Sequence, residues 1–221
     1  CRGNPVGACY GYNAIGVLQN ETELENYPHV ANAQPGDLIF EDVNGDGVIS
    51  PEDRTVIGQP TPSVILGVNA GVQAYGFDFS IEFNGQFGYE VANAKRSSRF
   101  GLYNFESVFL DRWHGEGTSN TEPRLTTAGI NYDNFSSRFL ESGNFLRLRN
   151  VQLGYSLPES VLERLRLTRL RVYVSGTNLM TWQDYSGYMP ELYNNNVFDV
   201  GIDAGKYPLA KSVLFGLDLS F

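Results

Sequence analysis

Apolar and polar residues alternate along much of the chain from residue 64 to its last residue. Two such runs, 64–73 and 77–90, flank a short turn at Ala74-Tyr75-Gly76, and this arrangement predicts a β-hairpin. In the second run one face is largely aromatic and the other is polar or acidic. The apolar face carries Phe77, Phe79, Ile81, Phe83, Phe87 and Tyr89, and the polar face carries Asp78, Ser80, Glu82, Asn84, Gln86 and Glu90. Such a pattern is typical of a strand whose two faces meet different surroundings.

Three more strands are predicted at 145–157, 170–180 and 212–221 by the same alternation. The first half of 145–157 is out of phase with its second half, which indicates a β-bulge or a segment above a bilayer. A short connection at 158–169 has room for one amphipathic turn. The segments 91–143 and 181–208 are expected to be long, irregular loops.

Strand length distinguishes two kinds of all-β fold. Strands of soluble β-sandwiches usually run about 5–6 residues, whereas strands tilted across a bilayer need about 9–11. The run 77–90 keeps its phase for fourteen residues. We therefore predict an all-β, transmembrane antiparallel β-barrel segment with long extracellular loops, in which the apolar side chains face lipid and the polar ones face a watery lumen. Five strands cannot close such a barrel, so the remaining strands must come from other residues or another chain.

The C-terminal residue, Phe221, resembles the aromatic that barrel-assembly machinery reads at the end of a last strand. If it lies in the periplasm, the turns at 74–76 and 158–169 are periplasmic as well, and the two long loops are outside. The chain then divides into an extracellular loop region, 1–62, and five barrel strands within 63–221. Because the sequence begins abruptly in a Gly/Pro-rich stretch, we expect residue 1 to be the start of a fragment.

Residues 42–53 have the spacing of a calcium loop of the EF-hand type. Oxygen-bearing side chains fall at loop positions 1, 3, 5 and 12, and a backbone carbonyl is available at position 7. The predicted ligands are Asp42, Asn44, Asp46, Val48 (through its carbonyl) and Asp53. The alternative is an Asx-rich turn without an ion, because Asn, Asp and Gly also favour turns. The sequence favours one Ca²⁺ site at this loop.

Details of the loop refine that prediction. Gly47 stands where a cation loop turns sharply, Ser50 could add an oxygen directly or through water, and Ile49 is expected to anchor the loop to packed residues beneath. Aspartate at position 12 is shorter than the usual glutamate, so we expect weak binding. A complete helix–loop–helix is not expected, because Pro60 and Pro62 would end any helix that followed.

Composition excludes several other functions. The formal net charge of −9 argues against nucleic acid as a partner, and no run of about 18 apolar residues predicts a membrane helix. Cys1 and Cys9 could form a disulfide in an oxidising compartment or remain free thiols. His29 and His114 are isolated and expected in exposed loops. No catalytic constellation is present, so we predict no catalytic residues and no enzyme.

Short motifs in a fixed order extend from about Tyr10 to Phe221. They include Tyr10-Gly11-Tyr12, Gly16, Gln19-Asn20, Pro35-Gly36-Asp37, 42–47, Asp53-Arg54, Ile57-Gly58, Gly76-Phe77-Asp78, 145–150, Gly154-Tyr155, Asn178-Leu179, Tyr185-Ser186-Gly187, Pro190-Glu191, Gly201-Ile202-Asp203, Tyr207-Pro208 and Phe215-Gly216-Leu217. In these motifs and their spacing the chain resembles the SusC/RagA-type TonB-dependent transporters of the Bacteroidota outer membrane. It departs from them at Met189, where the family often has aspartate.

The resemblance implies the C-terminal part of a 22-stranded barrel in the outer membrane of a Gram-negative bacterium, surrounded by membrane lipid and lipopolysaccharide. It also implies TonB-dependent import of an oligosaccharide or peptide, with a SusD-like surface lipoprotein as partner and TonB contacted through a part absent from this chain. No substrate-binding residue is identified. Trp113, Trp182 and Tyr185 could stack on sugar rings, or belong to aromatic girdles and loop packing, which we favour.

A function of another class is a calcium-dependent surface-binding module. A dockerin-like module needs two copies of the loop, and the sequence has one. A lectin or adhesin built as a soluble β-sandwich is the other form of this alternative, and it would bury the apolar face of the strands.

Overall fold

The computed structural model describes residue 3 and residues 7–96, 105–127, 129–192 and 199–221. By contacts the chain divides into two compact units. Unit 1 comprises 1–61, 90–142 and 192–205, and unit 2 comprises 62–89, 143–191 and 206–221. Unit 2 begins at residue 62, one residue before the start at residue 63 that the sequence predicted for the barrel region. The expected division into two continuous regions differs from this one, because 90–142 and 192–205 belong to the same unit as the N-terminal residues.

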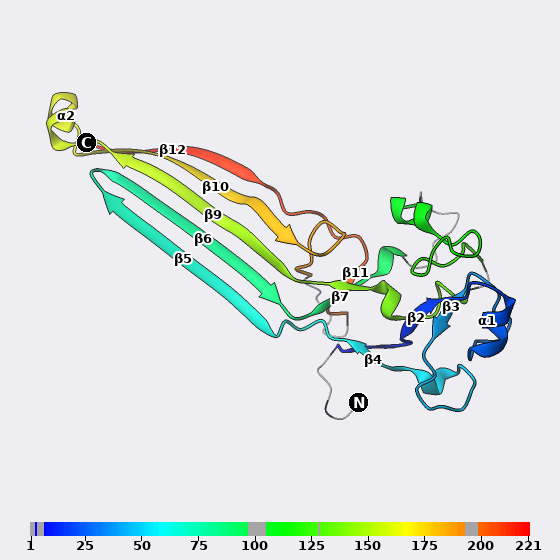
Figure 1. Cartoon of the computed structure of the whole chain (residues 1–221). Coiled ribbons are helices and arrows are strands. Elements are labelled where there is room, and N and C mark those ends of the chain that lie inside the picture. The colour runs from blue at the N-terminus through cyan, green and yellow to red at the C-terminus, as the bar shows by residue number, and fades with distance from the viewer. Residues whose placement is uncertain (1–2, 4–6, 97–104, 128, 193–198) are drawn as a thin grey trace. The chain divides into compact units, whose positions relative to one another are not determined.

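Unit 2 is one antiparallel sheet of five strands in the order β12-β10-β9-β6-β5 (Figure 1). The strands are β5 (Val64–Ala74), β6 (Phe77–Phe87), β9 (Phe145–Ser156), β10 (Arg169–Gln183) and β12 (Ser212–Ser220). All five strands predicted from the alternation are therefore present. Within this part of the chain β5 and β12 are the edges, so the sheet is open.

Short connections join the strands at one end of the sheet. β5 and β6 form the predicted hairpin, with positive φ at both turn residues, Tyr75 (52°) and Gly76 (84°), as in a tight two-residue turn. β9 and β10 are joined through α2 (Glu159–Leu165), the amphipathic turn expected at 158–169. Arg166 ends α2 in the left-handed conformation, with φ of 54°.

The expected bulge lies at Arg149. Glu82 pairs with Asn150 and Phe83 with Leu148, so Arg149 is the extra residue against β6. On its other side, β10 also leaves its regular register between Thr177 and Met180. The two irregularities are at the same level of the sheet, which explains why apolar residues change parity along β9 while remaining on one face.

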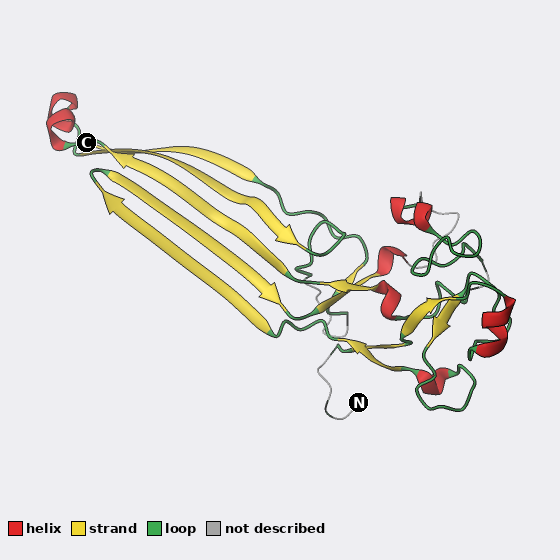
Figure 2. Cartoon of the chain, in the orientation of Figure 1, coloured by secondary structure: helices red, strands yellow, loops and turns green. Residues whose placement is uncertain are grey.

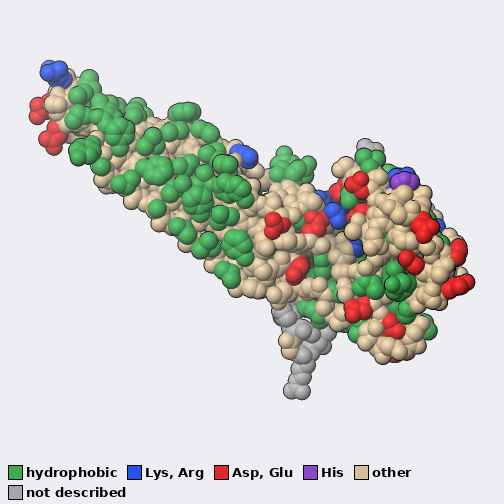
Figure 3. All heavy atoms as spheres, viewed as in Figure 1, with side chains coloured by type: hydrophobic (Ala, Val, Ile, Leu, Met, Phe, Trp, Pro, Cys, Tyr) green, Lys and Arg blue, Asp and Glu red, His purple; other side chains and the backbone are tan. Residues whose placement is uncertain are grey.

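One face of the sheet is apolar and exposed, as Figure 3 shows for the visible side of the strands. Its exposed residues are Val64, Leu66, Val68, Val72, Phe77, Phe79, Leu153, Val172, Met180, Trp182, Val213, Phe215, Leu217 and Leu219. β6 has 11 residues, and at about 3.4 Å per residue and a tilt near 45° it would cover about 26 Å of bilayer thickness, close to the ~25 Å apolar band of outer-membrane barrels.

The run at 77–90 is not one continuous strand. β6 ends at Phe87, Gly88 turns with φ of 73°, and Glu90 begins another strand, β7. Tyr89 is 5% exposed and packs over Gly143, so it does not belong to the exposed apolar face. The prediction of fourteen residues in phase is therefore wrong by three residues, because alternation of residue types continues across a turn that changes their surroundings.

Unit 1 contains short strands, turns and loops (Figure 2). β1 (Cys9–Gly11) pairs with β4 (Thr55–Gly58), β2 (Ala14–Val17) with β3 (Leu38–Phe40), and β7 (Glu90–Asn93) with both β8 (Leu140–Ser142) and β11 (Ile202–Asp203). Helix α1 (Glu21–Asn26) also belongs to this unit. The 3₁₀ turns are η1 (Pro51–Asp53), η2 (Ala94–Arg96), η3 (Ser107–Asp111) and η4 (Ser137–Phe139).

Packing in unit 1 explains why its irregular segments are ordered. Its core joins Tyr12, Val17, Leu38, Phe40 and Ile49, with the Tyr12 and Phe40 rings 5.0 Å apart. Among the described residues of 91–143, Val91, Phe109, Tyr132 and Phe139 are also buried. The described part of the predicted long loop is thus irregular but folded. Of the described helices, none has the length and apolar character needed to cross a membrane.

Candidate functional site: the 42–53 loop

The loop at 42–53 is built from side-chain oxygens that accept backbone N–H groups. Asp42 Oδ1 and Oδ2 accept from Gly45 N (2.7 Å) and Gly47 N (2.8 Å). Asp46 Oδ1 accepts from Val48 N at 2.8 Å. Gly45 and Gly47 have φ of 76° and 83°, a region that side chains disfavour, which is why glycine stands at these points of the turn.

Asn44 and Asp46 form a reciprocal pair within the loop. Asn44 Nδ2 donates to Asp46 Oδ2 (3.0 Å), and Asp46 N donates to Asn44 Oδ1 (2.9 Å). Asn44, Asp46 and Val48 are exposed, and Asp42 is half-buried. These contacts curl the chain around the first four predicted ligands, so the loop is shaped by its own hydrogen bonds.

Asp53, at position 12, has a second use that the ligand spacing did not reveal. It is fully buried, and its Oδ1 accepts from Val43 N (3.0 Å) while its Oδ2 accepts from Ser50 N (2.7 Å). With Ser50 Oγ accepting from Glu52 N (3.1 Å), it also forms the capping box of η1. The backbone N–H of Ser50 is the main cause that lowers the pKa of Asp53 below its usual value; the Asp42 side chain adds a smaller effect of the same sign.

The fit of this loop to Ca²⁺ is partial. Asn44 and Asp46 are exposed and Asp42 is half-buried, and each ionised carboxylate has more lone pairs than the hydrogen bonds described. Both oxygens of Asp42 and both of Asp53 accept backbone N–H groups, but Asp53 is fully buried as well. In the part of the chain that the structure describes, no three His, Cys, Asp or Glu side chains are grouped closely enough to hold a metal ion. The five predicted ligands and the single Ca²⁺ therefore stay a prediction.

Ile49 anchors the loop as expected. It is 6% exposed and belongs to the core cluster with Tyr12 and Phe40. The loop therefore stands on packed structure on one side and is open to solvent on the other.

The three aromatic residues proposed for sugar stacking have different surroundings. Trp113 packs on the core cluster, and its Nε1 donates to Gln19 Oε1 at 3.2 Å. Tyr185 is 4% exposed, with its ring over Gly187. Trp182 is 48% exposed on the apolar face of the sheet. Loop packing describes the first two, and a place in an aromatic girdle is consistent with the third.

Cysteine and histidine offer no further site in the described chain. Cys9 is a buried free thiol, and burial raises its pKa, with the charge of Glu90 adding to the effect. Cys1, its possible disulfide partner, lies outside the described residues. His29 and His114 are exposed loop residues, as expected.

A buried polar network in unit 1 was not found from the sequence. Asp37 is fully buried, and Arg124 binds both of its oxygens, with Nε–Oδ1 at 2.7 Å and Nη2–Oδ2 at 3.1 Å. Asn131 donates to Asp37 Oδ1 at 2.9 Å and accepts from Leu38 N at 2.9 Å. The motif around Asp37 carried the only sequence signal, since its partners are 87 and 94 residues away.

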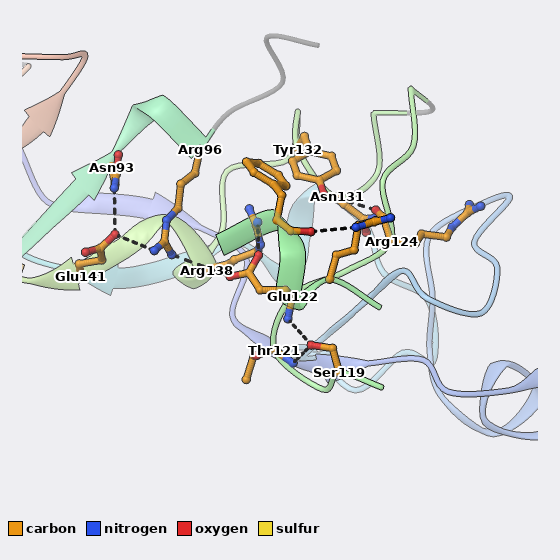
Figure 4. Close-up of polar contacts among 12 residues, drawn as sticks. Asn93, Arg96, Ser119, Thr121, Glu122, Arg124, Asn131, Tyr132, Arg138 and Glu141 are labelled. Carbon is orange, nitrogen blue, oxygen red and sulfur yellow. Dashed lines mark hydrogen bonds and ion pairs between the residues drawn. The ribbon is translucent and has the colours of Figure 1, made fainter. Parts of the chain in front are cut away.

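A second group of ion pairs adjoins this network in Figure 4. Arg96 Nη2 lies 3.3 Å from Glu141 Oε1, and Asn93 Nδ2 donates to the same oxygen at 2.9 Å. Arg138 Nη2 lies 2.5 Å from Glu122 Oε2. The pairs join β7 and η2 to the later segments 119–124 and 138–141, and so they hold separate parts of unit 1 in one arrangement.

The polar face of the sheet has its own ion-pair group. Arg171 in β10 donates through Nε to Asp78 Oδ1 (2.8 Å) and through Nη1 to Asp218 Oδ2 (3.2 Å). Gly154 of β9 lies beneath the first pair, and a Cβ there would be 2.4 Å from Asp78 Oδ1. The polar face thus carries charged side chains where the opposite face is apolar.

Comparison with family models gives no match. Curated proteins do match over nearly the whole chain. TonB-dependent receptor P3 of Formosa agariphila is 33% identical over 227 residues, covering 99% of this chain and 22% of that protein. TonB-dependent receptor SusC of Bacteroides thetaiotaomicron is 27% identical over 215 residues, covering 94% of this chain and 20% of that protein.

Solved structures give the same fold. The RagAB peptide importer in its "open-open" state matches with a TM-score of 0.72 at 22% identity, over 97% of this chain and 22% of that chain. The predicted all-β barrel fold is therefore confirmed. This chain spans less than a quarter of the length of each protein that it matches. On the motifs, the fold and these likenesses together, the chain belongs to the SusC/RagA-type TonB-dependent receptors.

Proposed function

We propose that this chain forms part of the wall and of the outer loops of a TonB-dependent importer in the outer membrane. The observation that carries the proposal is the two-sided sheet of unit 2. One face exposes Val, Leu and Phe side chains across five strands, and the other carries the Asp78–Arg171–Asp218 ion pairs. Water on both sides would leave the apolar side chains of the first face exposed to solvent. Lipid against that face and water against the other gives each face surroundings of matching polarity.

The cargo that we propose is an oligosaccharide or a peptide, imported together with a SusD-like surface lipoprotein. Support comes from the relatives: one is named SusC, and the structural neighbour is titled a peptide importer. In this arrangement the short connections, including α2, face the periplasm, and the long segments 91–143 and 181–208 are extracellular. The rest of the barrel and the contact with TonB come from residues outside this chain. The protein is a transporter and not an enzyme.

The soluble alternative is less well supported. A lectin or adhesin β-sandwich would cover the apolar face of this sheet with a second sheet. Within the described residues of unit 2, however, Val72, Phe77 and Phe215 are 60%, 53% and 81% exposed.

Growth on defined nutrients tests the import function. Cells lacking the gene for the complete transporter would be compared with complemented cells, using a tryptic digest of casein or a partial hydrolysate of starch as the growth-limiting nutrient. We expect complementation to restore growth on one of the two nutrients, and a strain without TonB to lose this benefit. Equal growth of deleted and complemented cells on both nutrients would contradict the proposal.

We also propose that the 42–53 loop binds one Ca²⁺ through Asp42, Asn44, Asp46, the Val48 carbonyl and, if it can be shared with the backbone, Asp53. The side-chain oxygens of the half-buried Asp42 and of the exposed Asn44 and Asp46 support the proposal, as does the sharp turn at Gly47. Weak, millimolar-range binding is expected, as in extracellular calcium modules. A site of this strength suits an outward-facing loop.

Hydrogen exchange of residues 42–50 tests for the metal, since the amides of Gly45, Gly47 and Val48 donate to side chains of the predicted ligands and so report the state of the loop. In the wild-type protein, adding Ca²⁺ to chelator-treated sample should slow exchange, and replacing Asp42 and Asp46 together by alanine should abolish that dependence. Glu52→Ala, which removes an exposed carboxylate beside the ligand positions, is the matched control. Wild-type exchange that is the same with Ca²⁺ and with chelator would remove the metal from the proposal.

A further inference from the structure

Residues 184–191 follow β10 and fold back over the polar face of the sheet, at the end opposite α2. The side of the sheet follows from the register. Arg147 pairs with Asn84 and with Thr181, and Arg147 Nε donates to Thr181 Oγ1 at 3.2 Å. Glu191 then binds Arg147 Nη1 at 2.7 Å from above this polar face. We call 184–191 the strap.

Several contacts along its length fix the strap. Gln183 Nε2, at the end of β10, donates to the carbonyls of Tyr185 (3.0 Å) and Gly187 (2.7 Å). Tyr89 Oη donates to the Pro190 carbonyl at 3.3 Å. These bonds curl the first half of the strap onto β10 and tie its second half to the segment after β6, so both halves are held.

Burial adds to these polar contacts. The Arg147 side chain is 4% exposed and its partner Glu191 is 13% exposed, while Tyr185 and Phe145 are 4% and 1% exposed. The Arg147 guanidinium also lies 4.8 Å from the centre of the Phe145 ring. A buried, doubly bonded arginine has few other conformations available, because breaking its pair would leave a charge in a dry site. The strap is therefore a preorganised part of the wall.

Tyr188 is the exception in this packed segment. It is 73% exposed, between the buried Tyr185 and Pro190. A tyrosine on a fixed backbone can contact a ligand with little loss of conformational entropy, since only two side-chain torsions remain to be ordered. A tyrosine ring can stack on the apolar face of a sugar or on an apolar peptide side chain while its hydroxyl stays in water.

We propose that the strap narrows the outer opening of the lumen and that Tyr188 is a specificity-determining contact for the imported molecule. This inference rests on the proposed import function, because it takes the polar face to be the lumen side. The ligand chemistry is an apolar face flanked by hydroxyl or amide groups, which oligosaccharides and peptides share. Arg147 and Glu191 are positioning residues that act through the strap.

The test uses the complete transporter, purified in detergent, with casein tryptic peptides and partially hydrolysed starch as separate probes. Binding is read by mass spectrometry of probe molecules retained after gel filtration. For whichever probe the wild type retains, Tyr188→Ala should lower the affinity about tenfold, the size expected for one stacking contact. Tyr188→Phe should stay within about twofold of wild type, since it keeps the ring.

Tyr75→Ala is the matched control, because Tyr75 is 98% exposed in the β5–β6 turn at the other end of the sheet. It should bind as the wild type does. Equal binding by Tyr188→Ala and wild type would overturn the inference while leaving import intact, and so would a loss in Tyr188→Phe as large as that in Tyr188→Ala. If the wild type retains neither probe, the proposed cargo classes fail and the inference fails with them.

A second variant tests the positioning role. Glu191→Gln keeps the size of the side chain but removes its charge from Arg147. We expect faster hydrogen exchange at 185–189 and a lower affinity for the same probe. Unchanged exchange in this variant would show that the ion pair does not hold the strap.

Discussion

Placing a charge on the apolar face should expose the two-sided nature of the sheet. Ile81 is next to Glu82, the central residue of β6 (Phe77–Phe87). One residue step of about 3.4 Å along a strand tilted by about 45° puts Ile81 within about 2–3 Å of the middle of the membrane. Arginine on the lipid side at that depth costs about 2–4 kcal/mol, which corresponds to a change on the order of 30- to 1000-fold in the folding equilibrium.

Ser80→Arg is the matched control. Ser80 precedes Ile81, is exposed on the polar face and pairs with Gly71 and Gln152. The two variants have the same charge and nearly the same depth and differ only in the face that carries the arginine. We expect the polar-face variant to lie within about 1 kcal/mol of wild type, because water can solvate its guanidinium.

The assay is refolding of the complete protein into lipid vesicles over a range of urea concentrations. Heat-modifiable migration in gel electrophoresis reports the folded fraction. Ile81→Arg should fold only at clearly lower urea than the wild type and Ser80→Arg. Equal urea dependence of the two variants would refute the assignment of lipid to the apolar face.

Three further outcomes follow from the packing. Gly154→Ala should lower the free energy of unfolding by about 1–3 kcal/mol through overpacking, whereas Gly71→Ala, with no side chain within 4 Å, should be nearly neutral in the same urea titration. Arg124→Ala should destabilise unit 1 by about 3 kcal/mol, because it leaves Asp37 buried without its cation; faster proteolysis at 105–127 would report it. The lowered pKa of Asp53 means that its stabilising effect is complete above its ordinary value of 3.8 and is lost as pH falls through its lower, folded value; protection of the 42–50 amides should therefore decrease below about pH 4.

The sheet could be predicted from sequence because its two environments impose a local, two-residue period. Each of the five strands has its own alternation of apolar and polar residues, so each could be predicted separately. Even the bulge at Arg149 was visible in the sequence as a change of phase. The end of β6 could not be found in this way. Apolar and polar residues continue to alternate past Gly88. Only the three-dimensional structure shows that the chain turns at Gly88 and that the Tyr89 side chain is buried.

Unit 1 was much less predictable, for a different reason. Its order depends on contacts between residues that are distant in sequence, such as Asp37 with Arg124. No sequence pattern around either residue predicts that the two are in contact. At the 42–53 loop, the spacing correctly predicted the sharp turn at Gly47 and the anchoring role of Ile49. It did not reveal that Asp53 accepts backbone N–H groups, because the same residue type serves a metal ligand and a helix cap equally well.

The pairing of Asp37 also has a consequence for biogenesis. Arg124 and Asn131 are synthesised only after the whole β5–β6 hairpin, so the Asp37 carboxylate lacks the Arg124 cation and the Asn131 amide while the first 61 residues stand alone. Unit 1 can fold completely only when all three of its segments have been synthesised. The conformational entropy lost on bringing these distant segments together opposes early folding. A gene truncated after residue 62 should therefore yield an unfolded, protease-sensitive peptide, and a chimaera that exchanges this unit between relatives would need all three segments exchanged together.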